Sequence, residues 1–120
     1  MENIGERYVQ LLAERNYDKM RELFHKDVTA RVLIPAGLFT IYTSENLINK
    51  IRSWFADSDV FRLEDSGISD LGGKLGVRYK FRGRENGEDY IVEQQIFSNV
   101  VDGKISSFDL MCSGFQKPEG

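Results

Sequence analysis

The sequence predicts an α+β fold, in which three helices of the N-terminal half pack on a mostly antiparallel sheet. Two observations predict it. Before residue 56, apolar residues recur in three segments at the spacing of an amphipathic helix. After Ser58, only strand-like runs separated by turn residues remain. Helices followed by a run of strands are typical of this class, and 120 residues fit a single domain spanning 1–120.

The second and third predicted helices have recognisable caps at their starts. The first carries Tyr8 on its apolar stripe and should end near Asn16. The Asn16 side chain can cap a second short helix, whose apolar positions continue to Phe24. A third helix follows a hydroxyl cap at Thr43 or Ser44, and it is the most clearly amphipathic of the three.

Strands are expected where β-branched and aromatic residues cluster between turn signals. A first strand begins at Asp27 and is closed by Pro35, which cannot donate to a central ladder. Asn86-Gly87 and Asp102-Gly103 are typical of tight hairpin turns. The four later strands are expected at roughly 59–71, 74–84, 89–100 and 104–115.

The Asp102-Gly103 turn determines which side chains of the last two strands share a face. A two-residue loop there makes directly opposed residues point the same way. The expected inner face then pairs Phe97 with Phe108, Gln95 with Leu110 and Glu93 with Cys112.

The Asn86-Gly87 turn conflicts with that face if it also has two residues. It would set Gln95 against Arg78, so an inner residue would oppose a basic outer one. We therefore expect a three-residue loop that includes Glu88, with a bulge at Gly87, which sets Tyr79 opposite Gln95. Arg78 then lies on the outside of the sheet.

Composition excludes some kinds of partner and site. A net charge of −3 and a pI near 5.2 argue against nucleic acid, which needs a basic field. One cysteine and one histidine cannot form an ordinary Cys/His zinc site, so we expect no metal and no cofactor. The sequence has no secretory signal pattern and no long apolar run, so we expect a cytoplasmic protein without a membrane partner.

The segments LFHKDV, VRYKF, YIVEQQIF, VDGKI and LMCSGF follow one another in the order of these predicted elements. Their order and pattern resemble the nuclear transport factor 2-like superfamily, which includes SnoaL-like polyketide cyclases and ketosteroid isomerases. The resemblance covers the whole chain and is closest to a bacterial branch. It implies a cone-shaped fold whose sheet curls around the helices and leaves an apolar cavity, and it makes a homodimer through the sheet face an expectation.

The resemblance also assigns roles to individual positions. Tyr8 matches the tyrosine that stabilises an oxyanion in the isomerases, and Gln95 matches their protonated aspartate. Val32 stands where those isomerases have their general base, so Glu93 is the candidate for proton transfer. The remaining candidate ligand-binding residues are Tyr79, Trp54, Phe97, Phe108, Leu110 and Cys112.

Three functions follow from these candidates. The first is binding of a small apolar molecule in the cavity, and the second is an isomerase, cyclase or dehydratase that uses Glu93 and Tyr8. The third is a non-catalytic dimerisation or interaction module. Structural roles stay open beside these: Tyr8 and Trp54 also suit a core, and Cys112 also suits an inert buried thiol. Glu93 also suits a structural hydrogen-bond acceptor, and Gln95 with Tyr79 also suits a satisfied polar pair.

Overall fold

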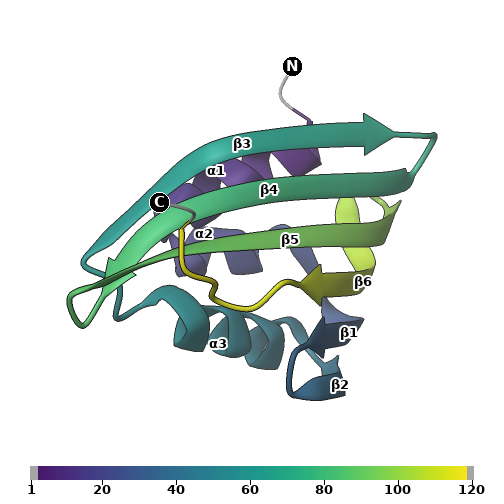
Figure 1. Cartoon of the computed structure of the whole chain (residues 1–120). Coiled ribbons are helices and arrows are strands. Elements are labelled where there is room, and N and C mark those ends of the chain that lie inside the picture. The colour runs from purple at the N-terminus through teal and green to yellow at the C-terminus, as the bar shows by residue number, and fades with distance from the viewer. Residues whose placement is uncertain (1–2, 119–120) are drawn as a thin grey trace.

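One sheet with helices on its inner face forms the molecule. The computed structural model describes residues 3–118. Within residues 3–118, six strands lie in the order β2-β1-β6-β5-β4-β3, and every neighbouring pair is antiparallel except β1 and β6. The long strands curve around three helices (Figure 1). The predicted α+β class, with three helices on a curved and mostly antiparallel sheet, is confirmed.

The helices begin at side-chain caps, and the caps of the second and third helices are the predicted ones. Asn3 caps α1 (Ile4–Ala13), Asn16 caps α2 (Tyr17–Arg21), and Thr43 caps α3 (Ser44–Phe55). Helix α2 ends earlier than predicted, because Phe24 pairs with Ile105 of the sheet instead of continuing the helix. No helix within residues 3–118 is long and apolar enough to cross a bilayer.

The strands lie close to their predicted ranges. Strand β1 begins three residues before the predicted start at Asp27, and the residues after Pro35 form a strand of their own at the edge of the sheet. The last strand ends at Cys112 rather than 115. The bounds are β1 Phe24–Ile34, β2 Gly37–Tyr42, β3 Val60–Asp70, β4 Lys74–Glu85, β5 Glu88–Val101 and β6 Lys104–Cys112.

Both hairpin loops contain two residues, so the predicted three-residue loop at Asn86-Gly87 is wrong. Glu85 pairs with Glu88 across that loop. Asn86 and Gly87 have φ of 53° and 78°, and Asp102 and Gly103 have φ of 52° and 77°. Positive φ at both central positions is the tight hairpin geometry that matches strand twist.

The bulge lies in the other hairpin, on β6. Asn99 pairs with Ser107 but Val100 pairs with Ile105, which leaves Ser106 as the extra residue. Serine hydroxyls stabilise this irregularity: Ser106 Oγ donates to the Asn99 carbonyl at 3.2 Å, and Ser107 Oγ accepts from the Asn99 backbone N–H at 3.2 Å. The bulge shifts the β5 register by one residue, which exchanges the two faces of β5.

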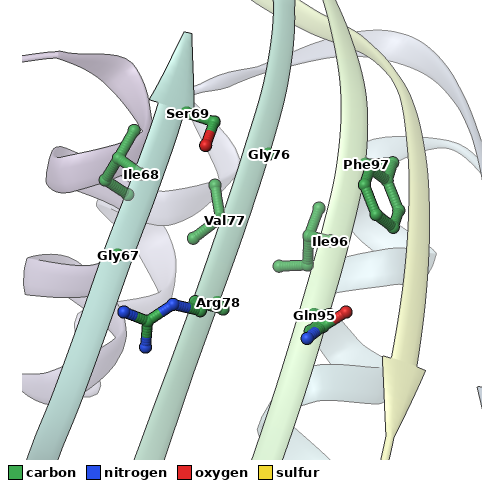
Figure 2. Close-up of a pocket in the computed structure, with 9 residues that line it drawn as sticks. All are labelled: Gly67, Ile68, Ser69, Gly76, Val77, Arg78, Gln95, Ile96 and Phe97. Carbon is green, nitrogen blue, oxygen red and sulfur yellow. The ribbon is translucent and has the colours of Figure 1, made fainter.

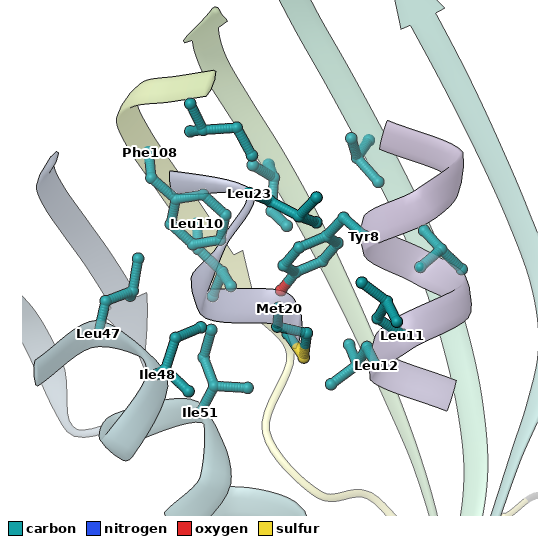
Figure 3. Packing of buried hydrophobic residues seen from close by; sticks show 14 of the residues in the cluster. Tyr8, Leu11, Leu12, Met20, Leu23, Leu47, Ile48, Ile51, Phe108 and Leu110 are labelled. Carbon is teal, nitrogen blue, oxygen red and sulfur yellow. The ribbon is translucent and has the colours of Figure 1, made fainter. Parts of the chain in front are cut away.

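The core fills the space between the inner face of the sheet and the helices (Figure 3). Tyr8 and Leu12 reach it from α1, Ile51 from α3, and Phe108 and Leu110 from β6, and each is at most 2% exposed. The predicted helix stripes and the predicted inner face of β6 therefore meet in one apolar cluster.

Candidate functional site

An apolar pocket of about 280 Å³ opens beside α3, at the end of the sheet where β1 and β6 finish. Its walls come from the end of α3, the turn after β1 and the segment after β6, with a small contribution from β5. Hydrocarbon and aromatic side chains dominate the lining, as in ligand sites generally. The lining residues are Ile34, Pro35, Ala36, Trp54, Phe55, Gln94, Cys112, Gly114 and Phe115.

A chain of buried polar groups leads from α1 to this pocket. The hydroxyls of Tyr8 and Tyr79 lie 3.1 Å apart, and the Tyr79 hydroxyl donates to Gln94 Oε1 at 2.5 Å. Gln94 Nε2 then donates to Cys112 Sγ at 3.3 Å. Gln94 is only 2% exposed, although it is a residue type that is rarely buried. Hydrogen bonding at both ends of its amide offsets the cost of that burial.

The chemistry of these groups determines which of them donates and which accepts in each hydrogen bond. An amide oxygen can only accept, so Tyr79 uses its single proton on Gln94 and must accept from Tyr8. The Gln94 amide therefore ends the chain as a donor. One of its two N–H groups is directed to a thiol, which is a weak acceptor.

Burial keeps both tyrosines neutral. It raises the pKa of Tyr8 well above the usual value for tyrosine, an effect that the hydrogen bond with Tyr79 partly offsets. Burial also raises the pKa of Tyr79 well above its usual value, and the neighbouring Tyr8 raises it further. Both hydroxyls thus remain protonated at neutral pH and can serve as donors.

The segment after β6 forms one wall of the pocket. Gly114 turns the chain at a φ of +79°, with Pro35 so close that a Cβ at Gly114 would lie 2.6 Å from its Cγ. The Phe115 ring packs edge-on against Tyr90 and Phe55, with ring centroids 4.6 Å and 6.0 Å apart. The strand predicted to run to 115 is thus replaced by a turn that holds an aromatic ring over the pocket.

Six of the predicted site residues lie on the inner side. Trp54 and Cys112 line the pocket, and Cys112 also meets the polar chain. Tyr8 and Tyr79 form that chain, whereas Phe108 and Leu110 are buried in the core away from the pocket lining. Val32, at the position of the general base in the isomerases, is fully buried opposite Leu110.

Glu93, Gln95 and Phe97 do not face the cavity, and the prediction that they do is wrong. The Glu93 side chain is 63% exposed, with its carboxylate 3.9 Å from Lys80 Nζ on the outer face. Phe97 is also 63% exposed, and Gln95 lies on the same outer face. The bulge on β6 is the physical reason, because it sets Gln94 rather than Gln95 beside the inward residues of its neighbours.

Gln94 and Phe115 are two of the pocket residues that the sequence did not predict as site residues. A signal for Gln94 exists in the pattern Tyr90, Val92, Gln94 and Ile96, which alternates as an inner face should. This alternation is hard to recognise, because Ile91 and Phe97 are large apolar residues on the opposite face. Nothing in the sequence around Phe115 indicates that its ring lies against Tyr90.

Solved structures with little sequence identity share this fold. A proposed polyketide cyclase from Xanthomonas campestris pv. campestris superposes with a TM-score of 0.75 at 17% identity, covering 90% of this chain and 86% of that chain. A proposed SnoaL-like polyketide cyclase from Mesorhizobium loti has a TM-score of 0.63 at 17% identity, covering 89% of this chain and 94% of that chain.

A third structure, from Catenulispora acidiphila, has a ketosteroid isomerase-like fold and is in complex with trimethylamine. It superposes with a TM-score of 0.69 at 16% identity, covering 89% of this chain and 85% of that chain. At these identities the likeness shows the fold alone. No curated protein matches the sequence. The model of the SnoaL-like domain family matches residues 5–108, so the chain belongs to the SnoaL-like domain family.

Proposed function

We propose that the protein binds a small, mainly apolar molecule in the pocket beside α3, with a hydrogen-bond acceptor of the ligand directed to Gln94. The observation that carries this proposal is the polar chain from Tyr8 through Tyr79, which ends as an amide donor among apolar pocket residues. A carbonyl oxygen is a stronger acceptor than the Cys112 sulfur that Gln94 now contacts.

The dimensions and lining of the pocket support a ligand of modest size. Its volume of about 280 Å³ is near the lower end of the roughly 300–1,000 Å³ range of ligand pockets. Trp54 and Phe115 offer aromatic surface to a flat ligand. One- and two-ring aromatic ketones fit this description better than long chains or large polycyclic molecules.

The structure favours binding over the proton-transfer alternative that uses Glu93. The carboxylate of Glu93 is on the opposite face of the sheet from the pocket, beside Lys80. The polar side chains that line the pocket within residues 3–118 are an amide and a thiol, Gln94 and Cys112. Proton transfer from Glu93 to a ligand in this pocket would need a path through the sheet.

A matched pair of ligands tests this proposal. We expect 2-acetylnaphthalene to bind more tightly than 2-ethylnaphthalene, which has a similar shape but no carbonyl, by roughly 3- to 10-fold for one hydrogen bond. Calorimetric titration measures both affinities. The ligand should also slow alkylation of Cys112 by iodoacetamide, because this thiol lines the pocket. Failure of both compounds to bind or to protect Cys112 would remove the proposal.

Two neighbouring glutamines provide the matched variants. Gln94→Leu removes the inward amide, and Gln95→Leu makes the same change on the outer face. We expect the preference for the ketone to disappear in Gln94→Leu and to persist in Gln95→Leu. An equal preference in both variants would show that the acceptor is recognised elsewhere.

A further inference from the structure

Strand β3 leaves one side of its backbone unpaired. It is the last strand of the sheet, beside α1, and within residues 3–118 only β4 pairs with it (Figure 1). Leu71 and Lys74 exchange both backbone hydrogen bonds across the hairpin loop, at 2.8 Å and 3.4 Å. Orientation alternates along an antiparallel ladder, so the N–H and C=O groups of Ser66 and Ile68 are directed away from β4. An exposed strand edge of this kind is a template for pairing with another chain.

Residues 66–70 are the part of this edge that suits an added strand. Before them, the register of β3 against β4 shifts between Leu63 and Asp65, and a bulge of this kind interrupts regular pairing. After Asp65 the register is unbroken to the end of the strand. Figure 2 shows the Arg78 guanidinium over Gly67 in this stretch, and Arg78 also donates to Asp65 at 2.9 Å. The cation on the outer side of this edge is therefore already paired.

An apolar groove of about 300 Å³ lies between β3 and α1, on the inner side of the edge. Leu63 and Ile68 line it from β3, and Val9 and Ala13 line it from α1. Ile68 points to the helix, since its Cδ1 atom is 3.2 Å from the position that a Cβ at Gly5 would take. Directly opposed residues of antiparallel strands share a face. A residue added opposite Ile68 would therefore direct its side chain to the groove.

Two acidic residues lie at the rim of the groove. Glu6 and Glu14 are exposed and line the groove from the side of α1. Within residues 3–118 neither forms an ion pair, and Glu14 accepts a hydrogen bond from the neutral Gln10 at 3.5 Å. By contrast, Asp109 on the outer face is bound by Arg31 at 2.8 Å. Unpaired carboxylates beside an apolar groove favour a partner with both apolar and cationic side chains.

We propose that an extended segment of a partner protein adds to residues 66–70 as an antiparallel seventh strand. An apolar residue of the segment lies opposite Ile68, and a Lys or Arg stands two positions before it and another two positions after it. All three side chains then share the inner face. The two cations are roughly 14 Å apart in a strand, and Glu6 and Glu14 are separated by about 12 Å along the helix.

The edge and the groove have separate parts in this recognition. The open backbone groups of β3 supply hydrogen bonds to a segment of any sequence, and the groove with its two carboxylates selects the side chains. The groove shares no lining residue with the pocket beside α3, so this inference does not rest on the proposed ligand.

Nuclear magnetic resonance titration of the labelled protein with the peptide acetyl-TKTITKT-amide tests the inference. We expect the backbone amide signals of residues 66–70 to shift and to saturate. The charge-reversed peptide acetyl-TETITET-amide should bind at least roughly tenfold more weakly, because it sets like charges together. Methylation of the central amide nitrogen of TKTITKT removes the donor opposite Ile68 and should weaken binding at least roughly fivefold.

Three single substitutions test the side-chain contacts. Glu6→Gln and Glu14→Gln should each weaken binding of TKTITKT by roughly threefold, as expected for an exposed ion pair. Glu22→Gln is the matched control, because Glu22 is an exposed acid at the end of α2 that does not line the groove. It should leave the affinity unchanged.

Several results would overturn the inference. They are the absence of shifts at residues 66–70 with millimolar TKTITKT, shifts confined to the pocket beside α3, and equal binding of the charge-reversed or the methylated peptide. The peptide comparisons use the unchanged protein, so they do not depend on the folding of any variant.

Discussion

The two faces of β5 hold similar residue types in opposite environments. The inner face places Gln94 between Val92 and Ile96, and the outer face places Gln95 between Glu93 and Phe97. Gln94 is 2% exposed and hydrogen-bonded at both ends, whereas Phe97 on the other face is 63% exposed. Residue type alone therefore does not assign a role here. The neighbours on β4 and β6 do, because they determine which side chains are enclosed.

The largest difference in the free energy of unfolding is expected between two phenylalanines, Phe97 and Phe108, that were both predicted to lie on the inner face. Phe108 is fully buried and Phe97 is 63% exposed. Phe108→Ala should lower the free energy of unfolding by about 3–5 kcal/mol, because it removes an aromatic ring from a packed core. Phe97→Ala should change it by no more than about 0.5 kcal/mol in dilute, monomeric protein. Urea unfolding measures both, and equal losses would contradict the assignment of the two faces.

An intermediate difference in the free energy of unfolding is expected between substitutions of the two adjacent glutamines, Gln94 and Gln95. Gln94→Leu leaves the buried Tyr79 hydroxyl without its acceptor and should cost about 1–3 kcal/mol. Gln95→Leu should stay within about 0.5 kcal/mol of wild type. Combining Gln94→Leu with Tyr79→Phe should cost less than the sum of the two single changes, because both remove the same hydrogen bond. Additive losses in urea unfolding would show that the two groups are not coupled.

The fold was largely predictable because its signals are local. The caps at Asn16 and Thr43 and the turns at Asn86-Gly87 and Asp102-Gly103 lie where the sequence analysis expected them. The exception at the end of the second helix has a non-local cause, since Phe24 joins the sheet by pairing with Ile105. Long-range strand pairing overrides a short helical pattern of this kind.

The candidate site was predicted less well because two errors in strand register inverted the two faces of β5. The sequence predicts a bulge at Gly87, where none exists, and none at Ser106, where one does. The errors cancel between β4 and β6, so Tyr79, Phe108 and Cys112 were assigned to the correct face. Only β5, between them, was inverted. The bulge at Ser106 is held by serine hydroxyls that bond to the Asn99 backbone, and hydrophobic periodicity does not show such contacts.

The smallest effect on the free energy of unfolding is expected from the ion pair between Arg31 and Asp109 on the outer face. The hydrogen bonds that Arg31 donates lower the pKa of Asp109 in the folded protein below the usual range. The ionised carboxylate therefore stabilises the fold fully at pH values above the pKa that Asp109 has in the unfolded chain. This contribution is lost as the pH falls through the lower, folded pKa. Solvent screens the pair, because the Asp109 side chain is 42% exposed, and the contribution should stay below about 1 kcal/mol.

Urea unfolding of wild type and Asp109→Asn, at neutral pH and at a pH below the folded pKa of Asp109, measures this difference. The variant should be less stable at neutral pH, and its deficit should shrink in acid, where the wild-type carboxyl is protonated as well. The buried inner face behaves differently, since the tyrosine hydroxyls stay neutral throughout this range. A deficit that is independent of pH would mean that Asp109 stabilises the outer face by packing rather than by charge.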